Sequence, residues 1–163
     1  MTGPRRLSQA ISEGDGISLI LAVTGPTEAL QAEARGAEAL LAEADHDAIR
    51  AACALPIVSA NGTAGDARIV GPGDEEVELH EGVELVVRVA REEELDEALE
   101  HFDPELFVLA APEAEDPLAH VLDLLSDVPA GKLAIADIAG VTPAQIDELE
   151  RAGFDAVLVR EPV

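Results

Sequence analysis

Charged side chains interrupt or directly follow several apolar runs of this 163-residue sequence; the four of interest are Arg88, Asp137, Arg160 and Glu161. An arginine inside an apolar run needs a carboxylate or a phosphate as partner, because an unpaired buried charge is costly. Two roles stay open for Arg88. It could form an internal ion pair with Asp137 or Glu43, or it could bind a phosphate or carboxylate ligand together with Arg160.

Three further polar residues stand between the predicted elements: Thr24, Asp45 and Asn61. We expect Asp45 to cap the helix that follows it, and Thr24 to belong to a loop and helix cap. Asn61 precedes a glycine and is typical of a turn. Each of the three could instead contact a ligand. Asp45 and His46 do not form an acid–base pair, because adjacent residues on a helix do not face each other.

The sequence lacks the patterns of common cofactor and catalytic sites. Its histidines show no ligand spacing, which predicts no metal site. No glycine-rich nucleotide-binding motif or nucleophile elbow occurs, so we expect no cofactor and assign no catalytic residue. The single cysteine, Cys53, cannot form an internal disulfide and is expected to be a small core residue in a cytoplasmic protein.

Eight apolar runs can position these side chains, and helical stretches separate most of them. Several runs are continuous rather than alternating, which is typical of strands that are covered on both faces. The runs are Ile17–Val23, Ala37–Ala42, Leu55–Ser59, Ala67–Val70, Val83–Val89, Glu105–Leu109, Leu133–Ala136 and Ala156–Val159.

Helices are predicted over most of the connecting segments. Arg91–Phe102 and Asp116–Ser126 carry apolar residues at the spacing of one helix face, and Gly153 ends a helix that begins after Thr142. Gly62–Asp66 is too short for a helix and predicts a loop. Shorter helices are expected over Arg6–Ile11, Thr27–Arg35, Asp45–Ala54 and Asp74–His80.

The segments around Gly36 and Gly153 resemble each other. If they open the second and eighth strands, six units of about 20 residues fit between them. This predicts a miniature (βα)₈ TIM barrel, a single α/β domain over residues 1–163 with very short loops and no helix after strand eight. Residues 1–16 would form a capping segment at the bottom of the barrel. An open doubly wound sheet is the alternative.

Three segments resemble indole-3-glycerol phosphate synthase: Gly36–Asp45, Val86–Leu95 and Ala136–Glu161. The resemblance implies a TIM barrel of the tryptophan-biosynthesis type. It also implies a carbon–carbon lyase that closes an indole ring, with a lysine as general acid and a glutamate as general base.

The chain departs from this family where the family carries its acid–base groups, and those positions hold Ala22, Thr24, Ala60, Arg88 and Ala110. Alanine can neither donate nor accept a proton. The resemblance therefore implies a barrel without the lyase activity that binds a small anionic or phosphorylated ligand at its C-terminal face. Two alternatives remain open: a lyase or isomerase that uses Asp45, Asp137 and Glu161, or a non-catalytic interaction module.

The chain is strongly acidic, with 34 Asp and Glu against 10 Lys and Arg. This charge argues against nucleic acid and anionic membranes as partners, because both are polyanions. High salt, heat and simple composition bias are three open explanations for the acidity. No apolar run is long enough to span a bilayer. A strand eight without a covering helix would leave an apolar face, so a homodimer is a further expectation.

Overall fold

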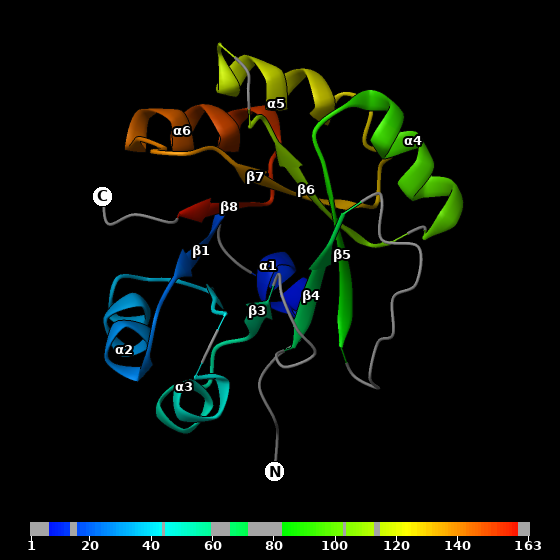
Figure 1. Ribbon diagram of the computed structural model, residues 1–163. Helices are drawn as coiled ribbons and strands as arrows, with labels where there is room; N and C mark the ends of the chain where they lie inside the picture. The colour runs from blue at the N-terminus through cyan, green and yellow to red at the C-terminus, as the bar shows by residue number, and fades with distance from the viewer. Residues whose placement is uncertain are drawn as a thin grey trace.

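Eight parallel strands close into a barrel in chain order, from β1 to β8 (Figure 1). The computed structural model describes residues 7–13, 16–43, 45–59, 66–71, 83–102, 104–112 and 115–159. The ring closes where β1 pairs with β8, from Ser18 opposite Ala156 to Leu21 opposite Val159. The predicted (βα)₈ barrel is confirmed, and the open doubly wound sheet is wrong.

Each predicted apolar run overlaps one of the eight strands, and the ends of run and strand agree within two residues. Continuous apolar runs form these strands because side chains on one face fill the barrel while those on the other pack under helices. The strands are β1 (Ser18–Ala22), β2 (Ala39–Leu41), β3 (Ile57–Ser59), β4 (Ala67–Val70), β5 (Glu84–Val89), β6 (Leu106–Ala110), β7 (Leu133–Asp137) and β8 (Ala156–Val159).

The described residues also form helices: α1 is seen at the centre of the ring of strands, and the others lie around its outside (Figure 1). The predicted helix over Asp74–His80 and most of the predicted loop over Gly62–Asp66 lie outside the described residues. None of the helices in the described ranges has the length and apolar character that a membrane crossing requires. The helices are α1 (Leu7–Glu13), α2 (Pro26–Ala34), α3 (His46–Ala52), α4 (Glu92–His101), α5 (Pro117–Leu125) and α6 (Pro143–Ala152).

The boundaries of α6 follow directly from its sequence. The Thr142 hydroxyl accepts a hydrogen bond from the backbone N–H of Gln145, and the Gln145 side chain accepts one from the backbone N–H of Thr142. This capping box satisfies two N–H groups that the first helical turn leaves without partners. Gly153 ends the helix at a φ of 111°, where a residue with a Cβ would be strained.

The core consists of two buried clusters on opposite faces of the strands. The inner cluster contains Val86 of β5, Val108 of β6 and Ile135 of β7. Their sequence neighbours Val87, Leu109 and others belong to the outer cluster beneath the helices. Because side chains alternate between the two faces of a strand, this division also shows whether each of the remaining residues on β5, β6 and β7 faces inward or outward.

Helix α1 fills the N-terminal end of the barrel and is seen at the centre of the ring in Figure 1. Leu7 and Ile11 are buried and belong to the inner cluster. The backbone N–H of Ser8 donates a 3.0 Å hydrogen bond to the carboxylate of Glu84, the first residue of β5. Glu84 therefore satisfies one of the free N–H groups at the start of α1 and holds the helix in place.

The outward side chains of β8 are already covered within one copy of the chain. Val157 and Val159 are at most 5% exposed. They belong to the same buried cluster as Ala32 of α2 and Leu149 of α6, which flank β8. The expectation that β8 presents an open apolar face is therefore wrong, and the homodimer prediction loses the argument on which it was based.

Candidate functional site

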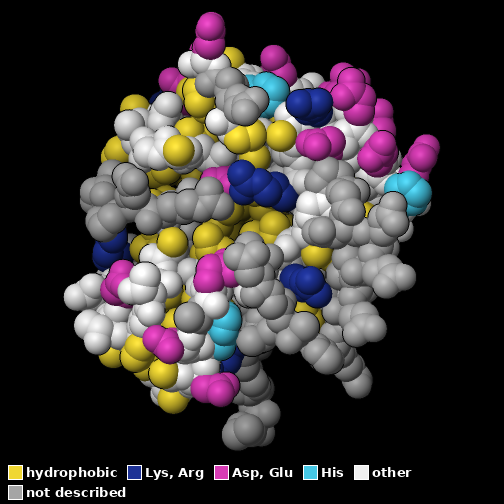
Figure 2. Space-filling view, viewed as in Figure 1, with side chains coloured by type: hydrophobic (Ala, Val, Ile, Leu, Met, Phe, Trp, Pro, Cys, Tyr) yellow, Lys and Arg dark blue, Asp and Glu magenta, His cyan; other side chains and the backbone are white. Residues whose placement is uncertain are grey.

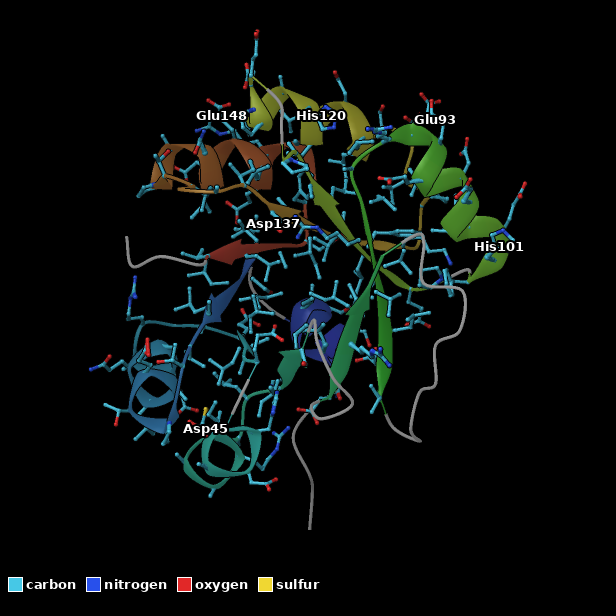
Figure 3. The ribbon with its side chains drawn as sticks, viewed as in Figure 1. Asp45, Glu93, His101, His120, Asp137 and Glu148 are labelled. Atoms are coloured by element: carbon cyan, nitrogen blue, oxygen red, sulfur yellow. The ribbon has the colours of Figure 1, made fainter. Side chains whose placement is uncertain are left out.

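Three side chains at the C-terminal ends of neighbouring strands point into the barrel. Arg88 of β5, Ala110 of β6 and Asp137 of β7 each stand two residues beyond a member of the inner cluster, namely Val86, Val108 and Ile135. The two-residue period of a strand therefore directs all three toward the barrel axis. Figure 3 shows Asp137 near the middle of the ring of strands.

Arg88 and Asp137 form an ion pair across the barrel mouth, in which Arg88 Nη1 donates to Asp137 Oδ2. Of the two partners that the sequence offered, Asp137 and Glu43, the described structure pairs Arg88 with Asp137. The two side chains differ in exposure: the side chain of Asp137 is 2% exposed and that of Arg88 is 35% exposed. The carboxylate is thus buried while the guanidinium reaches solvent.

The Arg88 guanidinium keeps donors that the ion pair does not use. A guanidinium carries five N–H donors in a planar fork, and one of its two terminal nitrogens faces Asp137. Within the described ranges, Asp137 is the one residue to which Arg88 is hydrogen-bonded. Figure 2 shows basic and acidic side chains beside hydrophobic ones at the centre of this face. The arrangement can hold an anion above an apolar floor.

The backbone that follows β5 is held from two helices. The N–H of Ala90 donates to a Glu94 carboxylate oxygen of α4 at 2.7 Å, and the Ala90 carbonyl lies 2.6 Å from His120 Nε2 of α5. A carbonyl oxygen only accepts hydrogen bonds, so the imidazole is the donor. These contacts fix the end of the strand that carries Arg88.

Sequence reasoning missed this role of His120. The contact joins residues 30 positions apart, so no local spacing signals it. His46 makes a similar contact nearer in sequence, with Nε2 2.9 Å from the carbonyl oxygen of Ala42, the residue that follows β2. The four-residue separation of His46 from Ala42 was the one sequence signal that could have revealed this contact.

Thr24 is engaged within its own loop. Its backbone N–H donates to a Glu28 carboxylate oxygen at 3.2 Å, and its hydroxyl donates to the same oxygen. The predicted association of Thr24 with a helix start is therefore seen, with Glu28 as the acceptor. Both the hydroxyl and the backbone amide of Thr24 are therefore hydrogen-bonded to Glu28 of α2.

Asp45 occupies the N-cap position of α3, as predicted, but its side chain makes no capping hydrogen bond. Its φ of 56° places it in the left-handed region, which Asp tolerates better than most residues. Because the Asp45 carboxylate makes no hydrogen bond to the free N–H groups of the helix, the predicted side-chain cap is wrong. A Cβ on Gly25 would lie 4.0 Å from Asp45 Oδ2, which places Asp45 beside the loop after β1.

The remaining predicted site residues, Asn61, Arg160 and Glu161, lie outside the described residues. The described ranges contain no group of three or more His, Cys, Asp or Glu side chains that could hold a metal ion.

Cys53 is buried, and burial raises the pKa of its thiol. A hydrogen bond with the Leu55 backbone opposes this rise, whereas the Glu33 carboxylate adds to it.

Comparison with known proteins finds similarity at the level of structure. No protein-family model and no curated protein matches the sequence. The chain resembles N-acetylmannosamine-6-phosphate 2-epimerase from Clostridium perfringens, with a TM-score of 0.70 and 14% identity over 88% of this chain and 86% of that one.

Two further solved structures are similar. Thiamine phosphate pyrophosphorylase from Pyrococcus furiosus gives a TM-score of 0.67 and 14% identity over 88% of this chain and 85% of that one. Phosphoenolpyruvate phosphomutase from Streptomyces platensis subsp. rosaceus gives a TM-score of 0.69 and 11% identity over 94% of this chain and 79% of that one. At such identities the likeness establishes the fold, and the chain is a small (βα)₈ TIM barrel.

Proposed function

We propose that this chain binds a small phosphorylated or otherwise anionic molecule at the C-terminal mouth of the barrel, with Arg88 as the anion-binding residue. The observation that carries the proposal is the asymmetry of the ion pair. Asp137 is buried and holds one edge of the guanidinium, while the 35% exposed side chain of Arg88 presents its remaining donors to solvent.

The chemistry of the guanidinium supports this role. Its planar fork matches the oxygen spacing of phosphate and carboxylate groups, and two parallel N–H···O bonds fix the orientation of such a ligand. Binding sites of TIM barrels lie at the C-terminal ends of the strands, where Arg88 stands. The names of all three similar structures contain a phosphorylated compound, which agrees with a phosphate group as the ligand's anion.

We infer that the lyase reaction implied by the resemblance to indole-3-glycerol phosphate synthase does not occur here. Ala22 and Ala110 stand where that family carries acid–base or polar groups, and neither has a proton to transfer. Asp137, the inward carboxylate of β7, is hydrogen-bonded to Arg88 and so serves to hold the guanidinium. Indole formation from the carboxyphenylamino-deoxyribulose phosphate substrate is expected to stay at the buffer rate.

Calorimetric titration with inorganic phosphate and with glycerol 3-phosphate tests the proposal. Wild-type protein is expected to bind, and Arg88→Gln is expected to bind at least about tenfold more weakly, because a charge-assisted hydrogen bond contributes roughly 1.5–3 kcal/mol. Arg88→Lys keeps the positive charge but loses the fork, so it is expected to fall between the two.

Arg91→Gln is the matched control. Arg91 is exposed, lies three residues from Arg88 and starts α4 outside the barrel, so its replacement makes the same change in net charge. It is expected to leave phosphate affinity unchanged. Equal weakening in both variants would show a general charge effect, and the absence of binding to wild-type protein would refute the proposal.

A further inference from the structure

The Arg88–Asp137 pair spans two strands that are not neighbours. In the barrel order, β6 lies between β5 and β7. Adjacent strands are about 4.8 Å apart, so the backbones that carry the two residues are separated by roughly 9–10 Å. One of the two side chains must therefore extend over β6, and Arg88 is the longer of them.

The strand register identifies the residue that this side chain crosses. Arg88 is opposite Val108 on β6, and Ala110 of β6 is opposite Asp137. Val108 and Ala110 both face inward, and Ala110 is the nearer of them to the mouth. Ala110 ends its strand and yet has no exposed surface, so other atoms cover it.

We propose that Ala110 is a positioning residue whose small side chain lets Arg88 cross β6 and reach Asp137. A branched side chain at this position would occupy the space of the crossing and lift the guanidinium away from the carboxylate. The consequence for ligand binding rests on the proposed function: once Arg88 loses Asp137, its remaining donors are no longer held toward the mouth.

The end of β5 cannot shift easily to relieve such a clash. Ala90, two residues beyond Arg88, is hydrogen-bonded through its N–H to Glu94 and through its carbonyl to His120. A local backbone movement of β5 would break these contacts. Strain from a larger residue at position 110 must therefore be relieved by the flexible side chain of Arg88.

A double-mutant cycle measures the proposal without any ligand. Arg88→Gln, Asp137→Asn and their combination are made in the wild-type chain and again with Ala110→Val, and urea unfolding midpoints are compared. In the wild-type chain, the decreases in unfolding midpoint caused by Arg88→Gln and by Asp137→Asn are expected to sum to more than the decrease caused by the double variant. With Ala110→Val this non-additivity is expected to disappear.

Ala136→Val is the matched control, because Ala136 is fully buried on β7 next to Asp137 but belongs to the outer cluster. It adds the same two methyl groups on the opposite face of the barrel wall, so the non-additivity is expected to persist. Ala110→Ser adds a single atom and is expected to reduce it in part. If Ala110→Val fails to fold, the Ala110→Ser cycle decides the question.

Persistence of full non-additivity in the Ala110→Val or Ala110→Ser background would overturn the proposal. Phosphate titration then separates it from the proposed function. If wild-type protein binds phosphate, Ala110→Val is expected to weaken binding roughly tenfold while Ala136→Val does not. If wild-type protein binds no phosphate, the proposed function fails, and the unfolding cycle still accepts or rejects the role of Ala110.

Discussion

Replacement of Leu7 by alanine is the sharpest test of how the barrel is closed at its N-terminal end. Leu7 is fully buried in the inner cluster, although it belongs to the short helix α1 rather than to a strand. Leu7→Ala removes three carbon atoms, and burial of each contributes about 0.8 kcal/mol. The cavity that remains adds to this loss, so we expect unfolding free energy to fall by about 3–4 kcal/mol.

Leu30→Ala is the matched control, since Leu30 of α2 is 50% exposed. The same change of residue type there is expected to alter the unfolding free energy by less than about 0.5 kcal/mol. Urea unfolding followed by far-UV circular dichroism is the suitable assay, because the chain contains no Trp or Tyr whose fluorescence or near-UV signal could report tertiary structure.

A Leu7→Ala variant as stable as Leu30→Ala would refute the reasoning, because it would mean that α1 does not contribute to the core. A large loss accompanied by a lower slope of unfolding free energy against urea would indicate something else. It would show that α1 detaches from the barrel before the strands unfold, since that slope scales with the surface exposed in the transition.

Two further predictions concern residues away from the mouth. Because burial raises the pKa of the Cys53 thiol, we expect Cys53 to react with a disulfide reagent at pH 8 far more slowly in the folded chain than in urea. The stability that comes from the raised pKa is fully present below the ordinary thiol pKa of about 8.5 and is lost as pH rises through the thiol pKa of the folded state. Equal labelling rates in the folded chain and in urea would contradict the prediction that the folded thiol is protected. Asp45→Ala should lower the unfolding free energy by about 1 kcal/mol, because alanine is strained at a φ of 56°, whereas Asp45→Gly should not; equal thermal midpoints for the two variants would show that this conformation is not retained.

The strands were predictable because their signal is local. Val83–Val89 is apolar except for Glu84 and Arg88, and both of these stand at inward positions at opposite ends of β5. A strand period of two residues is sufficient to predict which way Arg88 points. The carboxylate that pairs with Arg88, however, depends on the order of the strands in the closed ring.

The partner of Arg88 depends on strand order, which local sequence does not determine. Asp137 lies two strands from Arg88 around the ring, whereas Glu43 follows β2, three strands away in the other direction. The failure of the Asp45 cap has a similar origin. Asp is a favoured capping residue, but Asp45 stands at a φ of 56° and its carboxylate makes no capping hydrogen bond, and residue type alone does not signal this conformation.

The prediction for β8 failed for a reason of packing. From sequence, β8 is expected to lack a covering helix of its own, but local sequence does not show how far neighbouring helices extend over a strand. In the ring, a strand is covered by the helices on both of its sides. Leu149 of α6 and Ala32 of α2 contribute to the buried cluster that encloses Val157 and Val159.

Closure of the ring by β1 and β8 has a consequence for the nascent chain. The pairing joins Ser18 of β1 to Ala156 of β8, so the pairing of β1 stays incomplete until β8 has been synthesised. At about 5–20 residues per second, this interval is on the order of ten seconds. Throughout it, the free edge of β1 offers unpaired N–H and C=O groups to any other extended chain. The net charge of −24 places like charges on neighbouring nascent chains, and their mutual repulsion limits association until the barrel closes.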